Sequence, residues 1–414
     1  MKSLLSILIL LLGAVVPLFG QTTLEEYRTD VAAYSRTLKM ASAASRAAAG
    51  EAAAARTGLL PQLSLAGNFS WAFRCREDAE QWTFGVLPQL VQTLYGGGGV
   101  RAAARQAAIG RDIALCEEEF SRLEVRYAAE YAYWSLSAVE LYAEAMREYV
   151  ALIRSLREVV NRRFTEGYIA RGDVLMIDAR LSEAEYALVS VEQNREVALH
   201  NFNILRGEDP ALPVHLAEGI RDTLPLPRRI PADEAVVRRP DHTAALLRVD
   251  QADESVRRAR APYNPQLSVG VGGSWQPASP NRDGRTLIDG SAFVQLSVPI
   301  FHWGERRHTV AAARAAREQT VWTAEQHRDD ILREEMNGWT ALVQSRAQVD
   351  ASEESLRIAG ENLAISTYSY GEGLATILDV MQAQLSWIQL YTNAIRAHFN
   401  YAAAVSDYRR ITVQ

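Results

Sequence analysis

Lysine and cysteine are scarce in this chain of 414 residues, and the common catalytic motifs are missing. Of the 44 basic residues only Lys2 and Lys39 are lysines, and the formal net charge is −6. That balance gives no electrostatic reason to expect nucleic acid as a partner. The seven histidines form no HExxH pattern, the glycine run 96–99 is not followed by GK[ST], and no serine stands in a GxSxG context. We therefore expect no catalytic residues, no metal and no cofactor.

The two cysteines are Cys75 and Cys116. An even number is compatible with one disulfide if the chain is exported. We place Cys75 in a loop between strands and Cys116 well inside a long helix, whereas a bridge needs Cα atoms within about 7 Å of each other. Two unpaired thiols are therefore the favoured interpretation, and a disulfide is the alternative.

Only one apolar run is long enough to compare with a membrane span. It extends from Leu4 to Phe19, follows Lys2 and is followed by Gly20. A basic start, an apolar stretch and a small residue at its end are typical of a secretory signal peptide, which we assign to residues 1–20. Because the run is somewhat short for a spanning helix, a retained anchor is the less favoured alternative. No cysteine follows the run, so we expect export without a lipid anchor.

Three motifs occur twice, in the same order, about two hundred residues apart. They are ARTGLLPQLSLAG with ARAPYNPQLSVGV, YGGGGVRAAARQAA with WGERRHTVAAARAA, and FTEGYIARGDVLMIDARL with YGEGLATILDVMQAQL. We infer a tandem duplication, with a first repeat over 21–206, a proline-rich linker over 207–230 and a second repeat over 231–414. Each repeat is expected to contain a helix, two strands, a very long helix, a short turn and a return helix.

The expected helices carry apolar residues every three and four positions, which is typical of coiled coils. The first of them follows this spacing from Leu24 to Ala41. Proline is absent from 98–164 and from 305–370. Since a helix rises 1.5 Å per residue, each of these stretches predicts a helix about 100 Å long.

Four segments between the helices alternate apolar and small or polar residues. The clearest apolar positions are Leu63, Leu65, Phe69, Trp71, Phe73, Leu267, Val269, Val271, Trp275, Ala292, Val294, Leu296, Val298 and Ile300. The run 82–94 is less regular, and Pro88 predicts a bulge there. A surface loop is expected over 277–289. Runs of about ten residues with one apolar face suit transmembrane β-strands, and Trp71, Trp82 and Trp275 are candidates for an aromatic girdle. A hairpin of a soluble sandwich is the alternative.

Four strands form an open sheet with two free edges. Lipid cannot satisfy the hydrogen-bonding groups of a free edge, so a sheet in a membrane must close into a barrel. A barrel of four strands would have no lumen, so several chains must contribute to one barrel. The residues do not fix the number of chains, although three would give twelve strands.

The ordered set of duplicated motifs resembles the TolC / outer membrane efflux protein family. The resemblance is carried by the PQLS strand starts, the Tyr95-Gly96 and Trp303-Gly304 junctions, the RPD at Arg239, and the glycine turns that end in GDVL and LDVM. It covers nearly the whole mature chain. It implies a mainly α fold: a long coiled-coil tunnel through the periplasm, and four strands per chain in a homotrimeric twelve-stranded outer-membrane barrel.

The function that this resemblance implies is that of a passive exit duct in a tripartite efflux pump or type I secretion system. The implied partners are two other copies of the chain, a periplasmic adaptor (membrane fusion) protein, an inner-membrane pump and outer-membrane lipid. A soluble periplasmic scaffold or adaptor, built from coiled coils without a barrel, is the alternative.

Gly167 and Gly373 stand where each long helix turns into its return helix, and we expect positive φ angles at both. Asp173 and Asp379 follow in the first turn of the return helices, where the helix dipole favours a carboxylate. The resemblance places these turns at the periplasmic tip, in contact with the adaptor, and implies an acidic ring formed by Asp379. Many relatives have a second aspartate where this chain has Gln382, so cation selectivity or block at the constriction is in doubt or weaker here.

The two tips differ in charge. The first repeat carries Arg154, Arg157, Arg162, Arg163 and Arg171, whereas the second carries Glu361, Glu372 and Asp379. Our hypothesis is that arginine–carboxylate pairs between the two helix pairs hold the aperture shut. Solvated helix faces are the alternative, because an exposed pair contributes about 1 kcal/mol or less. The candidate gate comprises Arg162, Arg163, Tyr370, Glu372, Asp379 and Gln382.

Overall fold

A computed structural model describes residues 21–71, 73, 81–222, 224–279 and 284–414. The expected signal peptide and Cys75 lie outside these residues. The chain divides into two compact units. One contains the chain up to residue 38 together with 122–235 and 332–414, and we call it the helical unit. The other contains 39–121 and 236–331, and we call it the sheet unit.

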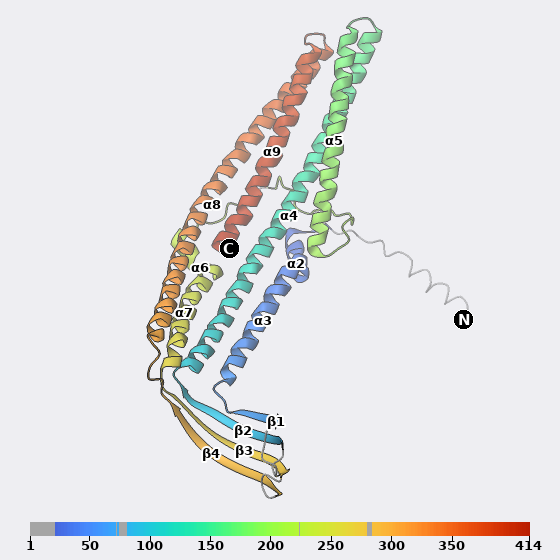
Figure 1. Cartoon of the computed structure of the whole chain (residues 1–414). Coiled ribbons are helices and arrows are strands. Elements are labelled where there is room, and N and C mark those ends of the chain that lie inside the picture. Colours follow the sequence, from blue (N-terminus) through green and yellow to red (C-terminus); the bar gives the residue numbers. More distant parts are fainter. Residues whose placement is uncertain (1–20, 72, 74–80, 223, 280–283) are drawn as a thin grey trace, which may run out of the picture. The chain divides into compact units, whose positions relative to one another are not determined.

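The helices follow the order expected for two repeats (Figure 1). The first half contains α2 (Leu24–Tyr34), α3 (Arg36–Thr57), α4 (Gly99–Thr165) and α5 (Arg171–Arg206), and the second contains α6 (Ala232–Arg238), α7 (Pro240–Arg260), η1 (Ala261–Tyr263), α8 (Glu305–Gly371) and α9 (Ile377–Thr412). The long helices α4 and α8 have 67 residues each, and Cys116 lies inside α4 as predicted. No helix in the described part of the chain combines the length and the apolarity that a membrane span requires.

The first expected helix is divided at Ser35. The Ser35 N–H still donates to the carbonyl of Val31 at 2.8 Å, while its hydroxyl accepts from the N–H of Leu38 at 3.3 Å. Ser35 therefore ends α2 and caps α3, because a serine hydroxyl can satisfy the free amides at the start of a helix. The second half has a comparable division, where Pro240 occupies the first turn of α7.

The four expected strands form one antiparallel sheet in the order β1-β2-β3-β4. They are β1 (Gln62–Trp71), β2 (Trp82–Gly96), β3 (Gln266–Ser279) and β4 (Arg285–Ser297). β3 and β4 extend further than predicted, so residues 277–279 and 285–289 of the expected loop belong to strands. The mainly α fold with four strands per chain is thus confirmed.

The bulge that Pro88 predicted lies elsewhere. Pro88 pairs with Leu65 in an unbroken register, and the register between β2 and β3 shifts between Thr93 and Tyr95 instead. Proline removes one N–H from the ladder without changing the residue count, so the register can continue through it.

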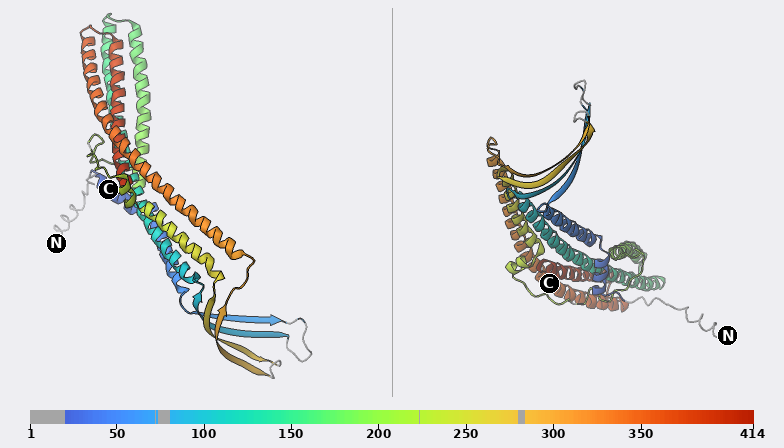
Figure 2. Two further views of the ribbon diagram at one scale, coloured as in Figure 1. Left: turned by 90° about the vertical axis from the view of Figure 1, so that its left-hand side faces the viewer. Right: turned by 90° about the horizontal axis from the view of Figure 1, so that it is seen from below.

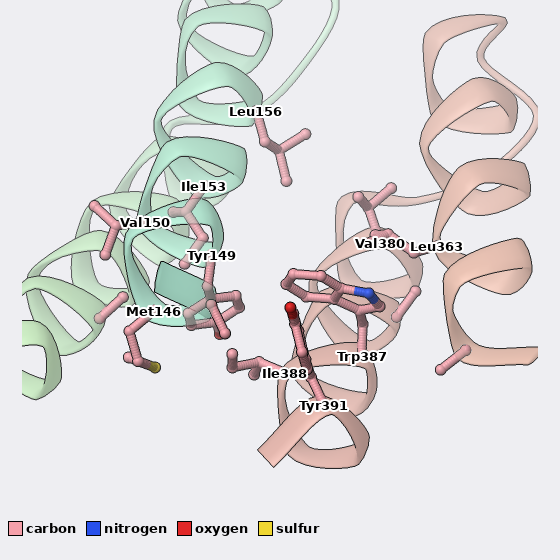
Figure 3. Close-up of a cluster of buried hydrophobic side chains, with 14 of the residues drawn as sticks. Met146, Tyr149, Val150, Ile153, Leu156, Leu363, Val380, Trp387, Ile388 and Tyr391 are labelled. Carbon is pink, nitrogen blue, oxygen red and sulfur yellow. The ribbon is translucent and has the colours of Figure 1, made fainter. Parts of the chain in front are cut away.

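The core of the helical unit lies between two helical hairpins, α4–α5 and α8–α9, which run side by side in Figures 1 and 2. Figure 3 shows side chains of α4, among them Tyr149, facing Trp387, Ile388 and Tyr391 of α9. The Trp387 and Tyr391 rings meet edge to face at a centroid distance of 5.3 Å. Burial of these large side chains fixes the two hairpins against each other.

The linker segment 207–230 packs against the same unit. The Tyr133 hydroxyl donates to Glu218 Oε2 at 2.5 Å, and the N–H of Ile220 donates to Ser137 Oγ at 2.8 Å. Further along, the Tyr401 hydroxyl donates to the carbonyl of Leu224 at 2.9 Å. Hydrogen bonds from two different long helices therefore hold this segment in place.

Candidate functional sites: the sheet faces and the helix tips

The strand register places most of the large apolar side chains on one face of the sheet and most of the polar side chains on the other. One face carries Leu63, Leu65, Phe69, Trp71, Trp82, Phe84, Val86, Leu90, Val269, Val271, Trp275, Ile288, Val294 and Leu296. The other carries Gln62, Ser64, Asn68, Ser70, Thr83, Gln89, Thr93, Ser268, Ser274, Asp289, Ser291 and Gln295. Within one chain the apolar face is uncovered, with Leu65 and Val294 each 72% exposed. An uncovered apolar face of this extent marks an interaction surface.

Two of the three predicted girdle residues are cross-strand partners. Trp71 pairs with Trp82 across β1 and β2, and Trp275 pairs with Val86 four residues further along β2. Trp275 also meets Phe84 edge to face at 6.2 Å. All three indoles lie on the apolar face.

β1 and β4 are the two edges of the sheet. Within the described residues, each of them pairs on one side only. Unpaired strand edges bind other strands readily. The sheet is therefore suited to completion by strands of further chains.

The two helix-connecting turns share one backbone geometry. Gly167 and Gly373 have φ angles of +84° and +81°, as predicted. After each glycine the next N–H donates back into the long helix, from Tyr168 to the carbonyl of Arg163 at 2.9 Å and from Leu374 to that of Ser369 at 2.8 Å. These bonds form the Schellman motif, which requires a left-handed residue and favours glycine there.

The residue after each glycine was missed by our sequence reasoning. Tyr168 is 78% exposed and Leu374 is 81% exposed, so each turn presents a large apolar side chain. In a Schellman motif the residue at this position usually packs back on its own helix. An apolar residue directly after the glycine was the available signal, and its exposure could not be inferred without the structure.

The two aspartates after the turns have different surroundings. The Asp379 carboxylate accepts from the Thr376 hydroxyl at 2.7 Å and from the Thr376 N–H at 2.8 Å, and its own N–H donates to the Thr376 hydroxyl at 3.3 Å. These hydrogen bonds lower the pKa of Asp379. Asp173 also lies in the first turn of its helix, but Ala170 precedes that helix and gives no side-chain cap. Both aspartates thus lie in the first turn of a return helix, as expected, and Asp379 in addition takes part in a capping box with Thr376.

One arginine of the candidate gate joins the two hairpins. Arg163 Nη2 donates to the carbonyl oxygen of Gly371 at 2.8 Å, and its Cζ lies 4.6 Å from the centroid of the Tyr370 ring. Tyr370 is only 4% exposed, and burial raises the pKa of its hydroxyl although Arg163 opposes this effect. Arg163 therefore connects the end of α4 with the end of α8.

The other arginine contacts differ from our hypothesis of carboxylate pairs between the hairpins. Arg154 pairs with Glu185 at 2.6 Å and Arg157 with Asp178 at 2.5 Å, both from α4 to α5 within one hairpin. Arg163 binds a carbonyl and a ring rather than a carboxylate. Neighbouring helices of a hairpin face each other through their flanking positions, so their charges are paired locally.

The remaining gate candidates, Arg162, Glu372 and Gln382, are exposed at or near the same tips. Among the described residues, no three His, Cys, Asp or Glu side chains are grouped so that they could hold a metal ion.

The comparisons with known proteins agree with this architecture. The model of a family described as "Outer membrane efflux protein" matches residues 29–207 and 232–411, one stretch in each half. Protein CyaE of Bordetella pertussis is 26% identical over 319 residues, which cover 74% of this chain and 65% of CyaE. Nodulation protein T of Rhizobium leguminosarum bv. trifolii is 26% identical over 56% of this chain and 51% of its own length. The chain thus spans half to two thirds of these relatives.

Among solved structures, the outer membrane protein VceC of Vibrio cholerae has the same fold. Its TM-score is 0.81 at 20% identity, with 94% of this chain and 95% of VceC covered.

Proposed function

The chain belongs to the outer membrane efflux protein family, and from this premise we propose that it is the outer-membrane channel of a bacterial export system. In this proposal it is a passive exit duct of a tripartite efflux pump or type I secretion system. The duct works with a periplasmic adaptor and an inner-membrane pump, and the chain itself catalyses no reaction.

The observation that carries the proposal is the two-faced sheet with free edges. An apolar outer face and a polar inner face are what a membrane barrel with an aqueous lumen requires. Lipid cannot satisfy open strand edges, so β1 of one chain pairs with β4 of the next until the barrel closes. Three chains supply twelve strands, a number within the range of known outer-membrane barrels.

A pair of adjacent substitutions tests this arrangement. Leu65→Arg puts a charge in the middle of the apolar face, where it costs about 2–4 kcal/mol per chain at the bilayer midplane. Ser64→Arg adds the same charge one residue earlier, on the polar face. We expect Ser64→Arg to form a heat-modifiable oligomer in outer membranes and to conduct in planar bilayers, while Leu65→Arg fails to assemble.

Equal assembly of both variants would contradict the assigned faces. A soluble periplasmic scaffold, the alternative, predicts that the wild-type chain leaves the cell on osmotic shock and remains monomeric in buffer without detergent. The uncovered apolar face argues against that outcome.

The helix tips supply the contact with the adaptor in this proposal. The two Schellman turns present Tyr168 and Leu374 in equivalent places, so three chains would offer six similar apolar contacts. We expect Leu374→Asp to lose copurification with the cognate adaptor, because a charge replaces an apolar contact. Tyr186→Asp, at an exposed residue within α5, serves as the control and should retain it.

The gate of the duct lies at the same tips. Arg163 holds the α4 tip to the α8 tip, and Tyr370 provides the ring on which the guanidinium stacks. Parting of the two hairpins breaks both contacts, so Arg163 favours the closed aperture. Asp379 and Gln382 line the constriction at the start of α9 in this proposal.

A further inference from the structure

Arginines gather where the helices of the sheet unit meet the strands. They occupy the last turns of α3 and α7, the first two turns of α4 and the first turn of α8. They are Arg56, Arg101, Arg105, Arg257, Arg258, Arg260, Arg306 and Arg307. We call these residues the arginine collar. The same segments (52–61, 97–107, 254–264 and 300–309) contain two carboxylates, Glu254 and Glu305, so their formal charge is +6 in a chain whose total is −6.

Local pairing accounts for only part of this charge. Arg257 pairs with Glu254, and Arg105 lies 3.7 Å from the same carboxylate. Among the described residues, Arg101, Arg306 and Arg307 make no ion pair. All three stand at the start of a helix, where the dipole disfavours a cation. Helix stability therefore does not explain their presence, and a negatively charged partner would.

An uncovered aromatic segment lies beside the collar. β4 ends at Ser297, and Phe301 and Trp303 follow with exposed fractions of 66% and 89%. Their rings meet at a centroid distance of 4.8 Å. Trp303 has a φ of +46°, a left-handed conformation that is rare for a bulky residue and costs on the order of 1–3 kcal/mol.

The collar and this segment continue the apolar face of the sheet. Leu296 belongs to that face, and Val298 and Ile300 occupy the next alternate positions beyond the strand. Tyr95, at the corresponding end of β2, is exposed as well. Moving along the chain from the sheet, one thus meets apolar residues, then aromatic rings, and then arginines.

We propose that the arginine collar, with Phe301 and Trp303, binds anionic phospholipid headgroups at the periplasmic surface of the outer membrane. Aromatic side chains suit the boundary between hydrocarbon and headgroups, and guanidinium groups bind phosphate through paired N–H donors. This sequence of apolar band, aromatic ring and cation matches the order of layers in a lipid leaflet. The proposal rests on the outer-membrane channel described above and assigns a lipid class to its periplasmic rim.

The test measures the lipid preference of the purified oligomer. Quenching of its tryptophan fluorescence by brominated phosphatidylglycerol and by brominated phosphatidylcholine, in reconstituted vesicles, gives the relative binding constant of the two lipids. We expect the wild type to prefer phosphatidylglycerol. Arg306→Gln/Arg307→Gln should reduce that preference by about fivefold for each arginine at low salt.

The control variant is Arg46→Gln/Arg228→Gln. It removes two exposed arginines outside the collar and changes the net charge equally, so the lipid preference should stay as in the wild type. If the collar variant does not assemble, the wild type alone still tests the idea. Its preference for phosphatidylglycerol must then fall as salt is raised, since salt screens such contacts.

A wild type without preference, or equal losses in collar and control variants, would overturn the proposal. If the wild type conducts in bilayers but shows no preference, the collar is wrong and the channel stands. If the wild type does not insert at all, the proposed channel fails and the collar with it.

Discussion

Replacement of Arg163 by alanine tests the gate most directly. The side chain contributes one charge-assisted hydrogen bond to Gly371 and one contact with the Tyr370 ring. At a partly exposed site the hydrogen bond is worth about 0.5–1.5 kcal/mol and the ring contact about 0.5–1 kcal/mol. Their sum is about 1–2.5 kcal/mol per chain.

Threefold assembly multiplies this small contribution. If the three tips part together, loss of all three contacts shifts the equilibrium between closed and open apertures by about 3–7.5 kcal/mol, since identical contacts in separate chains add. That corresponds to a factor of roughly 10² to 10⁵ in the ratio of open to closed apertures. A change of this size should be evident from single-channel recordings in planar bilayers without the adaptor.

Two further variants separate the contact from the charge. Arg163→Lys keeps the charge but loses the planar group that stacks on the ring, so we expect an intermediate open population. Arg162→Ala removes the same charge from the adjacent, exposed position and should change opening by less than about threefold. The reasoning is refuted if Arg163→Ala conducts as the wild type does, or if Arg162→Ala opens the channel equally well.

Two other predictions concern backbone and capping. Gly207 has a φ of +83°, and a Cβ there would lie 2.3 Å from the Tyr34 ring, whereas Gly167 has a similar φ and open space around it. Gly207→Ala should therefore lower the free energy of unfolding by about 2 kcal/mol or more and Gly167→Ala by about 1 kcal/mol. Denaturant titrations monitored by circular dichroism measure this, and equal unfolding midpoints for the two variants would contradict the prediction. The lowered pKa of Asp379 means that its cap is fully formed above the ordinary pKa of 3.8 and is lost as the pH falls through the lower, folded-state value. Hydrogen exchange at the start of α9, corrected for intrinsic rates, should accelerate below that pH in the wild type. Asp379→Asn should remove this pH dependence and Asp173→Asn should preserve it.

The sequence predicted the elements well because each has a strong period. Apolar residues at every second position located all four strands, and apolar residues at intervals of three and four positions located the long helices. The division at Ser35 was missed because the apolar spacing runs without interruption from Leu24 to Ala41. The outer ends of β3 and β4 were missed because polar residues such as Gln276 and Asp289 alternate with few apolar ones there.

The turns were predicted better than the contacts between them. Positive φ at Gly167 and Gly373 follows from glycine at a helix end, which is a local property. The partner of Arg163 is a backbone carbonyl, which leaves no trace in residue identity. Thr376 at the position before α9 did indicate the cap of Asp379, since Thr-x-x-Asp resembles a capping box, and our sequence reasoning did not use it.

The connection between the two central strands sets the order in which the sheet can form. β1 with β2, and β3 with β4, are neighbours in sequence, but residues 97–265 separate β2 from β3. Closing so long a loop is slow, so we expect the hairpins β1–β2 and β3–β4 to form before β2 pairs with β3. Until β2 and β3 pair, the two hairpins expose four unpaired strand edges and their apolar side chains to water. We therefore expect chain fragments that end before β3 to aggregate, because their free strand edges can pair with those of other chains.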